Sequence, residues 1–207
     1  MKNKRFFRSD FNVCLLLCVL FIYTPQAHAQ EASPSKAEYG KKEFIQDFQQ
    51  AVLLVRLQDK DLSLKRLEEE GLMEQAEKIR EKQRRENREI VLSFRKTFDF
   101  CPVYFFYAKD SEAIRSGDYI GKLFNADLQS VKLSPDQKVF TAEFAETDDL
   151  GIDGLIIRDD QLLSFEDPLP YFQRRFVFFG LIERSKARMV ETYNKRLHQY
   201  AEKYRQG

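Results

Sequence analysis

The fold class follows from one run of residues, Phe98-Asp99-Phe100-Cys101-Pro102-Val103-Tyr104-Phe105-Phe106-Tyr107-Ala108. Positions 103–108 carry no charge and are mostly aromatic or β-branched, the residue types that pack well on a pleated surface. An apolar run of this length predicts a strand buried on both faces, and Pro102 stands at its entry, where a missing N–H costs least. Since such a strand needs layers above and below it, we expect it at the centre of a sheet that helices cover.

Long helices are predicted on the N-terminal side of this strand. Apolar residues recur at spacings of three and four over 39–57, which predicts one deeply packed helix. The same stripe resumes before Gly71, a residue typical of a helix end, and a second helix is predicted over 72–98. Its middle, 81–89, interleaves acids and bases at helical pair spacing, which indicates a solvated face rather than a site for nucleic acid. We expect a helical hairpin whose tip, near Gly71 or in the charged middle, reaches beyond the rest of the domain.

A second hairpin and a terminal helix are predicted on the C-terminal side. Residues 139–145 alternate in part, as in a strand, and 154–158 and 161–165 are separated by two aspartates, the length of a tight hairpin turn. The last helix is predicted over 182–204. The resulting fold class is α/β: a single domain over 39–207 in which a small mixed sheet packs against the helical hairpin and the C-terminal helix. A thioredoxin-like arrangement of the sheet is one alternative.

The first 29 residues have the pattern of a signal peptide. Four basic residues precede an apolar segment over 11–23, shorter than the about 20 residues that span a bilayer, and Ala27-His28-Ala29 is the small-x-small pattern that signal peptidase recognises. We expect cleavage before Gln30, a periplasmic or secreted protein, and no transmembrane anchor after cleavage; an uncleaved anchor is the alternative. The predicted organisation is a signal peptide over 1–29, a flexible linker over 30–38, the helical hairpin over 39–98, a sheet region over 102–180 and the C-terminal helix over 182–205.

The charge balance predicts no attraction to nucleic acid. The whole chain has 34 basic and 33 acidic residues, and four basic and one acidic residue lie in 1–29, which leaves 30 and 32 in the mature chain. A net charge this close to zero exerts no general pull on nucleic acid or on an anionic membrane.

Cys101 is the one cysteine that remains after the predicted cleavage, since Cys14 and Cys18 lie in the signal segment. The mature chain then has no intramolecular disulfide. A lone thiol in an oxidising compartment is a nucleophile, a mixed-disulfide site or a small buried hydrophobe. The flanking Phe100 and Pro102 favour burial.

A stripe of tyrosines on the last predicted helix is the other candidate for binding. Tyr193, Tyr200 and Tyr204 fall on one helix face. Tyrosines on a terminal helix more often form a docking face with hydrated hydroxyls than a ligand cage. The binding residues that the sequence predicts are therefore Cys101 and these three tyrosines.

Familiar catalytic patterns are missing from the sequence. His198 is the single histidine after residue 29, which excludes multi-histidine metal sites, and no glycine-rich phosphate loop occurs. The acids within 146–153 carry oxygen ligands that suit calcium but lack the full loop spacing, so we expect a solvated turn there. A catalytic pair of carboxylates, as in glycosidases, remains an alternative, because the fold rather than the sequence spacing determines which carboxylates lie close together. We predict no catalytic residue, no metal and no cofactor, which disfavours an enzyme without excluding one.

Three stretches, 51–57, 98–107 and 169–172, together resemble a family of uncharacterised secreted proteins from Bacteroidota-type bacteria. This resemblance covers most of the mature chain and implies no activity. The chain also resembles thioredoxin-fold proteins, more weakly, because an apolar strand precedes a short helix and, later, an antiparallel hairpin. It lacks the Cys-x-x-Cys motif, and Cys101 stands before the strand rather than after it, so this resemblance implies no redox activity.

Two functions of different class follow from these observations. The first is a non-enzymatic interaction or scaffolding protein that docks a protein partner in the cell envelope through its helices. The excess of amphipathic helix over catalytic residue types favours it. The second is a degenerate thioredoxin-like protein with a thiol or small-ligand function at Cys101.

Overall fold

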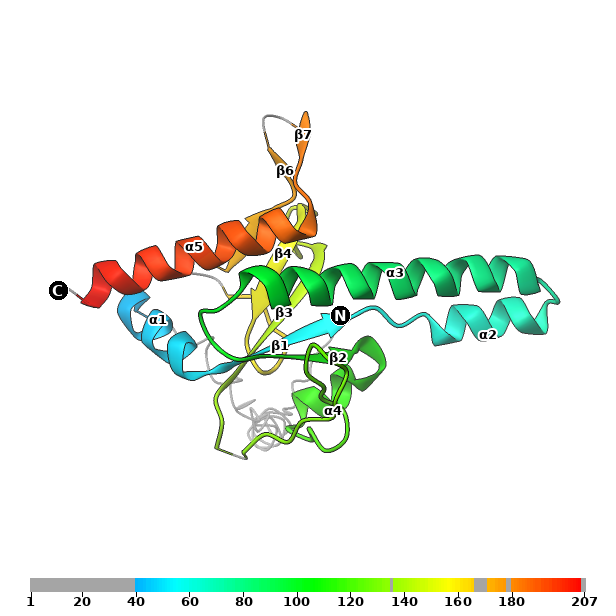
Figure 1. Cartoon of the computed structure of the whole chain (residues 1–207), viewed down its shortest axis with the longest axis horizontal. Coiled ribbons are helices and arrows are strands. Elements are labelled where there is room, and N and C mark those ends of the chain that lie inside the picture. The colour runs from blue at the N-terminus through cyan, green and yellow to red at the C-terminus, as the bar shows by residue number, and fades with distance from the viewer. Residues whose placement is uncertain (1–39, 135, 166–170, 178–179, 206–207) are drawn as a thin grey trace, which may run out of the picture. The chain divides into compact units, whose positions relative to one another are not determined.

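A computed structural model of the protein describes residues 40–134, 136–165, 171–177 and 180–205, all within the unit Ala37–Gly207. The elements are α1 (Lys41–Gln50), β1 (Val52–Leu57), α2 (Asp61–Glu69), α3 (Met73–Thr97), β2 (Val103–Tyr107), the 3₁₀ turn η1 (Ala108–Asp110), α4 (Ser111–Arg115), β3 (Val139–Glu146), β4 (Asp153–Arg158), β5 (Phe172–Arg174), β6 (Phe176–Val177), β7 (Ile182–Glu183) and α5 (Lys186–Arg205) (Figure 1). The predicted signal peptide and linker lie outside the described residues. Within those ranges, no helix combines the length and apolar character needed to cross a membrane.

A mixed sheet with the strand order β2-β1-β3-β4-β5 organises the described part. β2, β1 and β3 are parallel, whereas β4 and β5 run antiparallel to their neighbours. The chain moves outward from β1 to β2 and then returns past β1 to β3. Because crossovers between parallel strands are right-handed, the two connections lie on opposite faces of the sheet. α3 accordingly covers one face and α4 the other, which confirms the predicted α/β class.

Each face of the sheet carries an apolar core. The larger one, called the main core, lies between the sheet and α1, α3 and α5. Several of its aromatic rings pack edge to face, as do Phe44 and Phe140 with ring centroids 5.5 Å apart. The second core lies on the other face. It is made of Val52, Leu54, Phe106, Ile114, Leu123 and Val139. Alternate residues of β1 enter alternate cores, as the period of a strand requires.

The helix predicted over 39–57 is wrong in its second half. α1 ends at Gln50, and the residues that follow form β1. Every residue of β1 except Arg56 is buried, because the strand has a neighbour on each side and a core on each face. A short apolar run satisfies a helical stripe and a doubly buried strand equally well, so only the tertiary partners distinguish them.

The run from Val103 forms a strand, as predicted, but at the edge of the sheet rather than at its centre. β2 pairs with β1 on one side. On the other side the backbone of Phe105 exchanges two hydrogen bonds with Phe124, at 2.8 and 3.1 Å. The segment after α4 thereby closes this edge, and the inner positions of the sheet go to β1, β3 and β4.

The hairpin predicted over 154–165 is half present. β4 matches its first strand, but the chain then turns around Asp159, whose Oδ1 accepts hydrogen bonds from the N–H groups of Gln161 and Leu163 at 3.0 and 2.7 Å. In the described part of the chain a single bridge joins Arg158 to Ser164. β4 instead pairs with β3 and β5, because these strands offer longer ladders than the residues after the turn.

β6 and β7 form a separate two-stranded sheet. The last helix, predicted from residue 182, therefore begins at Lys186, since Ile182 and Glu183 pair with Val177 and Phe176. Figure 1 shows this hairpin standing apart from α5 and from the larger sheet.

Candidate functional site

The tyrosines predicted to form a docking face on α5 do not share one environment. Tyr193 is 0% exposed within the main core, so the prediction that it contacts a partner is wrong. Its hydroxyl has no hydrogen-bond partner among the described residues, and burial raises the pKa of that hydroxyl well above its ordinary value. Tyr200 and Tyr204 are half-buried at the rim of the main core, with ring centroids 6.3 Å apart. The stripe is thus largely a packing surface.

Cys101 lies in the main core immediately before β2, where it is 8% exposed. Burial raises the pKa of its thiol to about 12. The thiolate, which is the reactive form, is therefore scarce at neutral pH. In this environment the side chain acts as a small apolar packing group, as the flanking residues predict.

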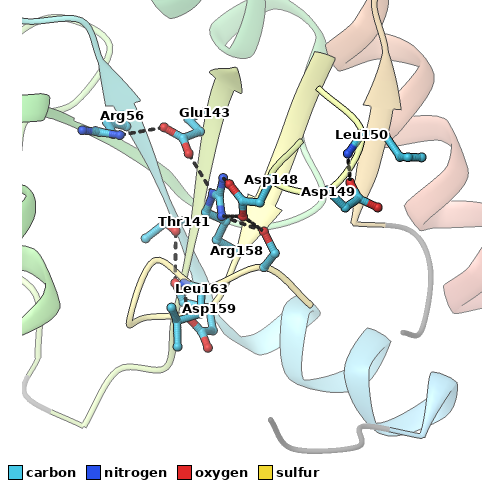
Figure 2. A network of polar contacts seen from close by, with 10 residues as sticks. Arg56, Thr141, Glu143, Asp148, Asp149, Leu150, Arg158, Asp159 and Leu163 are labelled. Atoms are coloured by element: carbon cyan, nitrogen blue, oxygen red, sulfur yellow. Dashed lines mark hydrogen bonds and ion pairs between the residues drawn. The ribbon is translucent and has the colours of Figure 1, made fainter. Parts of the chain in front are cut away.

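A chain of charged side chains crosses β1, β3 and β4 on the face of the second core (Figure 2). Glu143 lies between two arginines: its Oε2 accepts a hydrogen bond from Arg56 Nη1 at 2.8 Å, and its Oε1 accepts one from Arg158 Nε at 2.7 Å. Arg158 also donates to both carboxylate oxygens of Asp148, at 2.7 and 3.1 Å, and to the Ser164 hydroxyl at 2.6 Å. We call these five residues the arginine network.

The arginine network is suited to holding strands together rather than to acid–base chemistry. Both oxygens of Glu143 and of Asp148 already accept hydrogen bonds from guanidinium groups, so neither carboxylate is poised as a general base. The hydrogen bonds to Asp148, together with the charge of Glu143, raise the pKa of Arg158. The network therefore fastens three strands to the loop at 147–152 and to the turn after β4.

Sequence analysis missed the arginine network, although a signal for it exists. Arg56 and Arg158 each interrupt or end an apolar strand run, at 52–57 and 154–158. A charge next to a buried run needs a partner. Burying a polar group without a hydrogen bond costs about 2–7 kcal/mol, and burying an unpaired charge costs more. The pattern predicts an ion pair but not its partner, since Glu143 lies on another strand, 87 residues from Arg56 and 15 from Arg158.

A helical arm, residues 61–86, leaves the sheet at the carboxyl end of β1. It consists of α2, the turn at Gly71 and most of α3, and Figure 1 shows the two helices side by side, extending away from the sheet. At 25 residues, α3 is roughly 37 Å long. The predicted helix end at Gly71 is confirmed: this residue has φ +76°, and the Leu72 N–H donates to the Leu67 carbonyl at 2.8 Å, as in a Schellman motif.

The base of the helical arm is held by buried polar contacts. Asn87, 9% exposed, accepts a hydrogen bond from the Gln58 N–H and donates one to the Gln58 carbonyl, both at 2.9 Å. Gln83 Oε1 accepts a bond from the Lys60 N–H at 3.0 Å. Two buried polar atoms close to these contacts, Arg56 Nε and Gln58 Oε1, have no hydrogen-bond partner among the described residues. The hydrogen bonds of Asn87 and Gln83 to the backbone after β1 thus fix where the arm begins.

The outer part of the helical arm has little core of its own. Within residues 61–86, all of which the structure describes, Leu64 and Ala76 are the buried apolar side chains. Arg80 pairs with Glu77 on its own helix and with Glu68 on α2, but these side chains are more than a third exposed. Exposed ion pairs each contribute about 0–1 kcal/mol, so the arm is weakly held beyond its base.

The tip of the helical arm combines apolar and acidic groups. Met73 is 61% exposed and Leu72 is 38% exposed. Residues 68–74 contain four glutamates, and each of them pairs with a base outside this stretch. An exposed apolar spot edged by charged groups is typical of a contact site for another molecule.

The remaining polar features of the described residues are surface contacts. Asp99 and His198 pair at 2.8 Å with both side chains more than half exposed. Among the acids of 146–153, Asp153 pairs with Arg175 at 2.7 Å, so the predicted solvated turn is partly drawn into ion pairs. An open groove of about 610 Å³ is lined by Lys96, Thr97, Ser185, Ala187, Arg188 and Glu191. Over the described part of the chain, no group of three or more His, Cys, Asp or Glu side chains is arranged to hold a metal ion.

No family model, no curated protein and no solved structure matches the chain. The function is therefore inferred from the contacts described above.

Proposed function

We propose that the protein is a non-enzymatic interaction module that docks a protein partner through its helical arm. The observation that carries this proposal is the tip at 68–74, where Leu72 and Met73 are exposed at the end of a helix pair whose base is fixed by buried Asn87. A helix pair presented from a fixed base suits insertion of an apolar tip into a groove of another protein.

The charge of the tip defines the chemistry expected of the partner. Four glutamates surround the exposed apolar residues, and each of them pairs with a base just outside the tip, so the rim of the apolar spot carries both signs of charge. A complementary surface presents an apolar pocket whose rim also carries both signs of charge, because matched potentials favour encounter and reject wrong partners. The partner we propose is a protein with such a pocket.

The signal-peptide pattern supports a partner in the cell envelope. Residues 1–29 have the basic, apolar and small-x-small regions that direct export. We infer that the protein works in the periplasm or outside the cell. The alternative, a thioredoxin-like protein with a thiol or small-ligand function at Cys101, has less support, since the pKa of that thiol is raised to about 12.

Site-specific photocrosslinking in the native envelope tests the docking arm. A photoreactive residue is placed at Met73, at the tip, and in a matched variant at Leu92, an exposed apolar position 49% exposed on the same helix. The two positions lie 19 residues apart, about 28 Å along α3. We expect one reproducible adduct from position 73 and none of the same size from position 92.

A charged substitution then measures the contribution of the tip. Met73→Lys replaces the exposed apolar side chain with a charged one and should weaken co-purification of the crosslinked protein about tenfold or more, whereas Leu92→Lys should leave it within twofold. Equal adducts from both positions, or no adduct from any position in 68–74, would reject the helical arm as the docking element.

A further inference from the structure

β5 is the outermost strand of the five-stranded sheet, and among the described residues its only strand partner is β4. The Tyr171 carbonyl accepts a hydrogen bond from β4 at 2.7 Å, and the Arg175 N–H donates one to the first residue of β4 at 2.9 Å. Backbone groups of neighbouring residues in a strand point to opposite edges. The N–H and C=O groups of Phe172 and Arg174 therefore point away from β4, toward the outer edge of the sheet.

Both outward carbonyls of β5 accept hydrogen bonds from arginine side chains. Arg196 of α5 donates from Nη1 to the Phe172 carbonyl at 3.0 Å. Arg184, which lies just before α5, donates from Nη1 to the Arg174 carbonyl at 3.4 Å. The two carbonyls belong to residues two positions apart, so they lie about 7 Å apart along the edge. The guanidinium groups thus occupy the acceptors that an added strand would need.

Gln173 connects these two contacts. Its side chain is 5% exposed, its Oε1 accepts a hydrogen bond from Arg196 Nη1 at 3.3 Å, and its Nε2 donates to the Arg174 carbonyl at 3.5 Å. A buried side chain has few alternative positions, so it holds the Arg196 guanidinium against the edge of the strand. We call Gln173, Arg184 and Arg196 the edge cap.

We propose that the edge cap prevents a second copy of the chain from extending the sheet at β5. An open strand edge is a template for pairing with another chain, and proteins often protect such edges with charged side chains. Pairing of β5 with β5 would need the two capped carbonyls as acceptors. It would also bring the arginines of both copies to one seam, where like charges repel. This device acts on β5 and is independent of the helical arm.

Removal of both guanidinium groups tests the proposal in the full-length protein. The double variant Arg184→Met, Arg196→Met keeps the apolar stems of the two side chains and loses their donors and charges. Analytical ultracentrifugation from about 1 to 100 µM compares its self-association with that of the unmodified protein. We expect the double variant to self-associate with a dissociation constant at least about tenfold lower.

Hydrogen exchange read by NMR identifies the strand that pairs. The outward N–H groups of Phe172 and Arg174 would become donors to the second copy. In the double variant their exchange should therefore slow about tenfold as the protein concentration rises, and in the unmodified protein it should not change.

Two further variants control for charge and for folding. The double variant Arg85→Met, Arg115→Met removes two exposed guanidinium groups of α3 and α4, and should leave self-association within about twofold of the unmodified protein. Arg184→Met alone removes one hydrogen bond at the surface and keeps the buried contacts of Arg196. It should strengthen self-association about threefold, and it provides the test if the double variant does not fold.

Three results would overturn the proposal. The first is self-association of the folded edge-cap variants no stronger than that of the unmodified protein. The second is stronger association without slower exchange at Phe172 and Arg174, since the copies would then meet elsewhere. The third is equal association of the control with Arg85 and Arg115 replaced, since the loss of any two surface charges would then suffice.

Discussion

Cys101 keeps its proton because the main core surrounds it. The ordinary thiol pKa is 9.0, whereas burial raises it to about 12 in the folded protein. Between these values the folded state binds a proton that the unfolded state has lost, so the contribution of this thiol to the free energy of unfolding is constant below pH 9 and falls as the pH rises further. Tyr193, whose pKa is raised for the same reason, adds to the fall above pH 10. Urea unfolding should show about 1–2 kcal/mol less stability at pH 10 than at pH 8.

The thiol is tested separately with Cys101→Ala. This variant is expected to lose stability at every pH through its small cavity, but to show a much smaller decrease between pH 8 and pH 9.5. The Cys101 peptide should also resist alkylation in the native protein and react once urea unfolds it. If Cys101→Ala loses as much stability between pH 8 and pH 9.5 as the unmodified protein, the thiol is not the cause of the loss. Rapid alkylation of the native protein would show that the thiol is accessible.

One guanidinium, that of Arg158, links the neighbouring strands β3 and β4. Arg158 is 8% exposed and connects Glu143 of β3 with Asp148 and Ser164 beyond the strands. Arg158→Met removes these bonds and leaves Asp148 without its guanidinium donor. Breaking a buried charge pair costs about 3–5 kcal/mol, and we expect less here, about 1–3 kcal/mol, because Arg56 still pairs with Glu143 and the Asp148 side chain is 65% exposed. Chemical denaturation measures the loss.

A matched change separates burial from charge. Arg115 pairs with Glu112 at 2.9 Å on the surface of α4, with both side chains more than 45% exposed. Arg115→Met should change the free energy of unfolding by less than about 0.5 kcal/mol, since exposed pairs contribute little. If both arginine variants cost the same, the arginine network does not stabilise the sheet.

Stability is expected to be uneven across the molecule. β1 has a core on each face, whereas Leu64 and Ala76 are the buried apolar side chains of the helical arm within 61–86. Regions with few buried apolar contacts open at free energies below that of global unfolding. Native-state hydrogen exchange, read by mass spectrometry, should therefore show α2 amides exchanging at least tenfold faster than those of β1 and β3.

Asn87→Ala tests the link between the helical arm and the sheet. The variant loses both hydrogen bonds to the Gln58 backbone, which should cost about 1–3 kcal/mol and further accelerate exchange at 58–60 and in α2. Gln75→Ala, at an exposed position of α3, is the control and should change neither. Equal protection of α2 and β1 in the unmodified protein would mean that the arm unfolds only with the sheet.

The sequence by itself determined the features that depend on local pattern. The long helix α3, the helix end at Gly71, the strand β3 and the burial of Cys101 follow from spacing, from a residue able to adopt positive φ, and from flanking apolar residues. The α/β class followed because long helical periods surround short apolar runs.

Only the tertiary structure decided the features that depend on distant partners. Residues 51–57 fit a helix stripe and a buried strand alike until β2 and β3 flank them. β2 became an edge strand because Phe124 closes its outer side. Tyr193 faces the core because α5 packs on the sheet, and Arg56, Glu143 and Arg158 meet because their strands do. Spacing along the chain carries no information about which separate segments become neighbours in space, and those neighbours set burial and pairing.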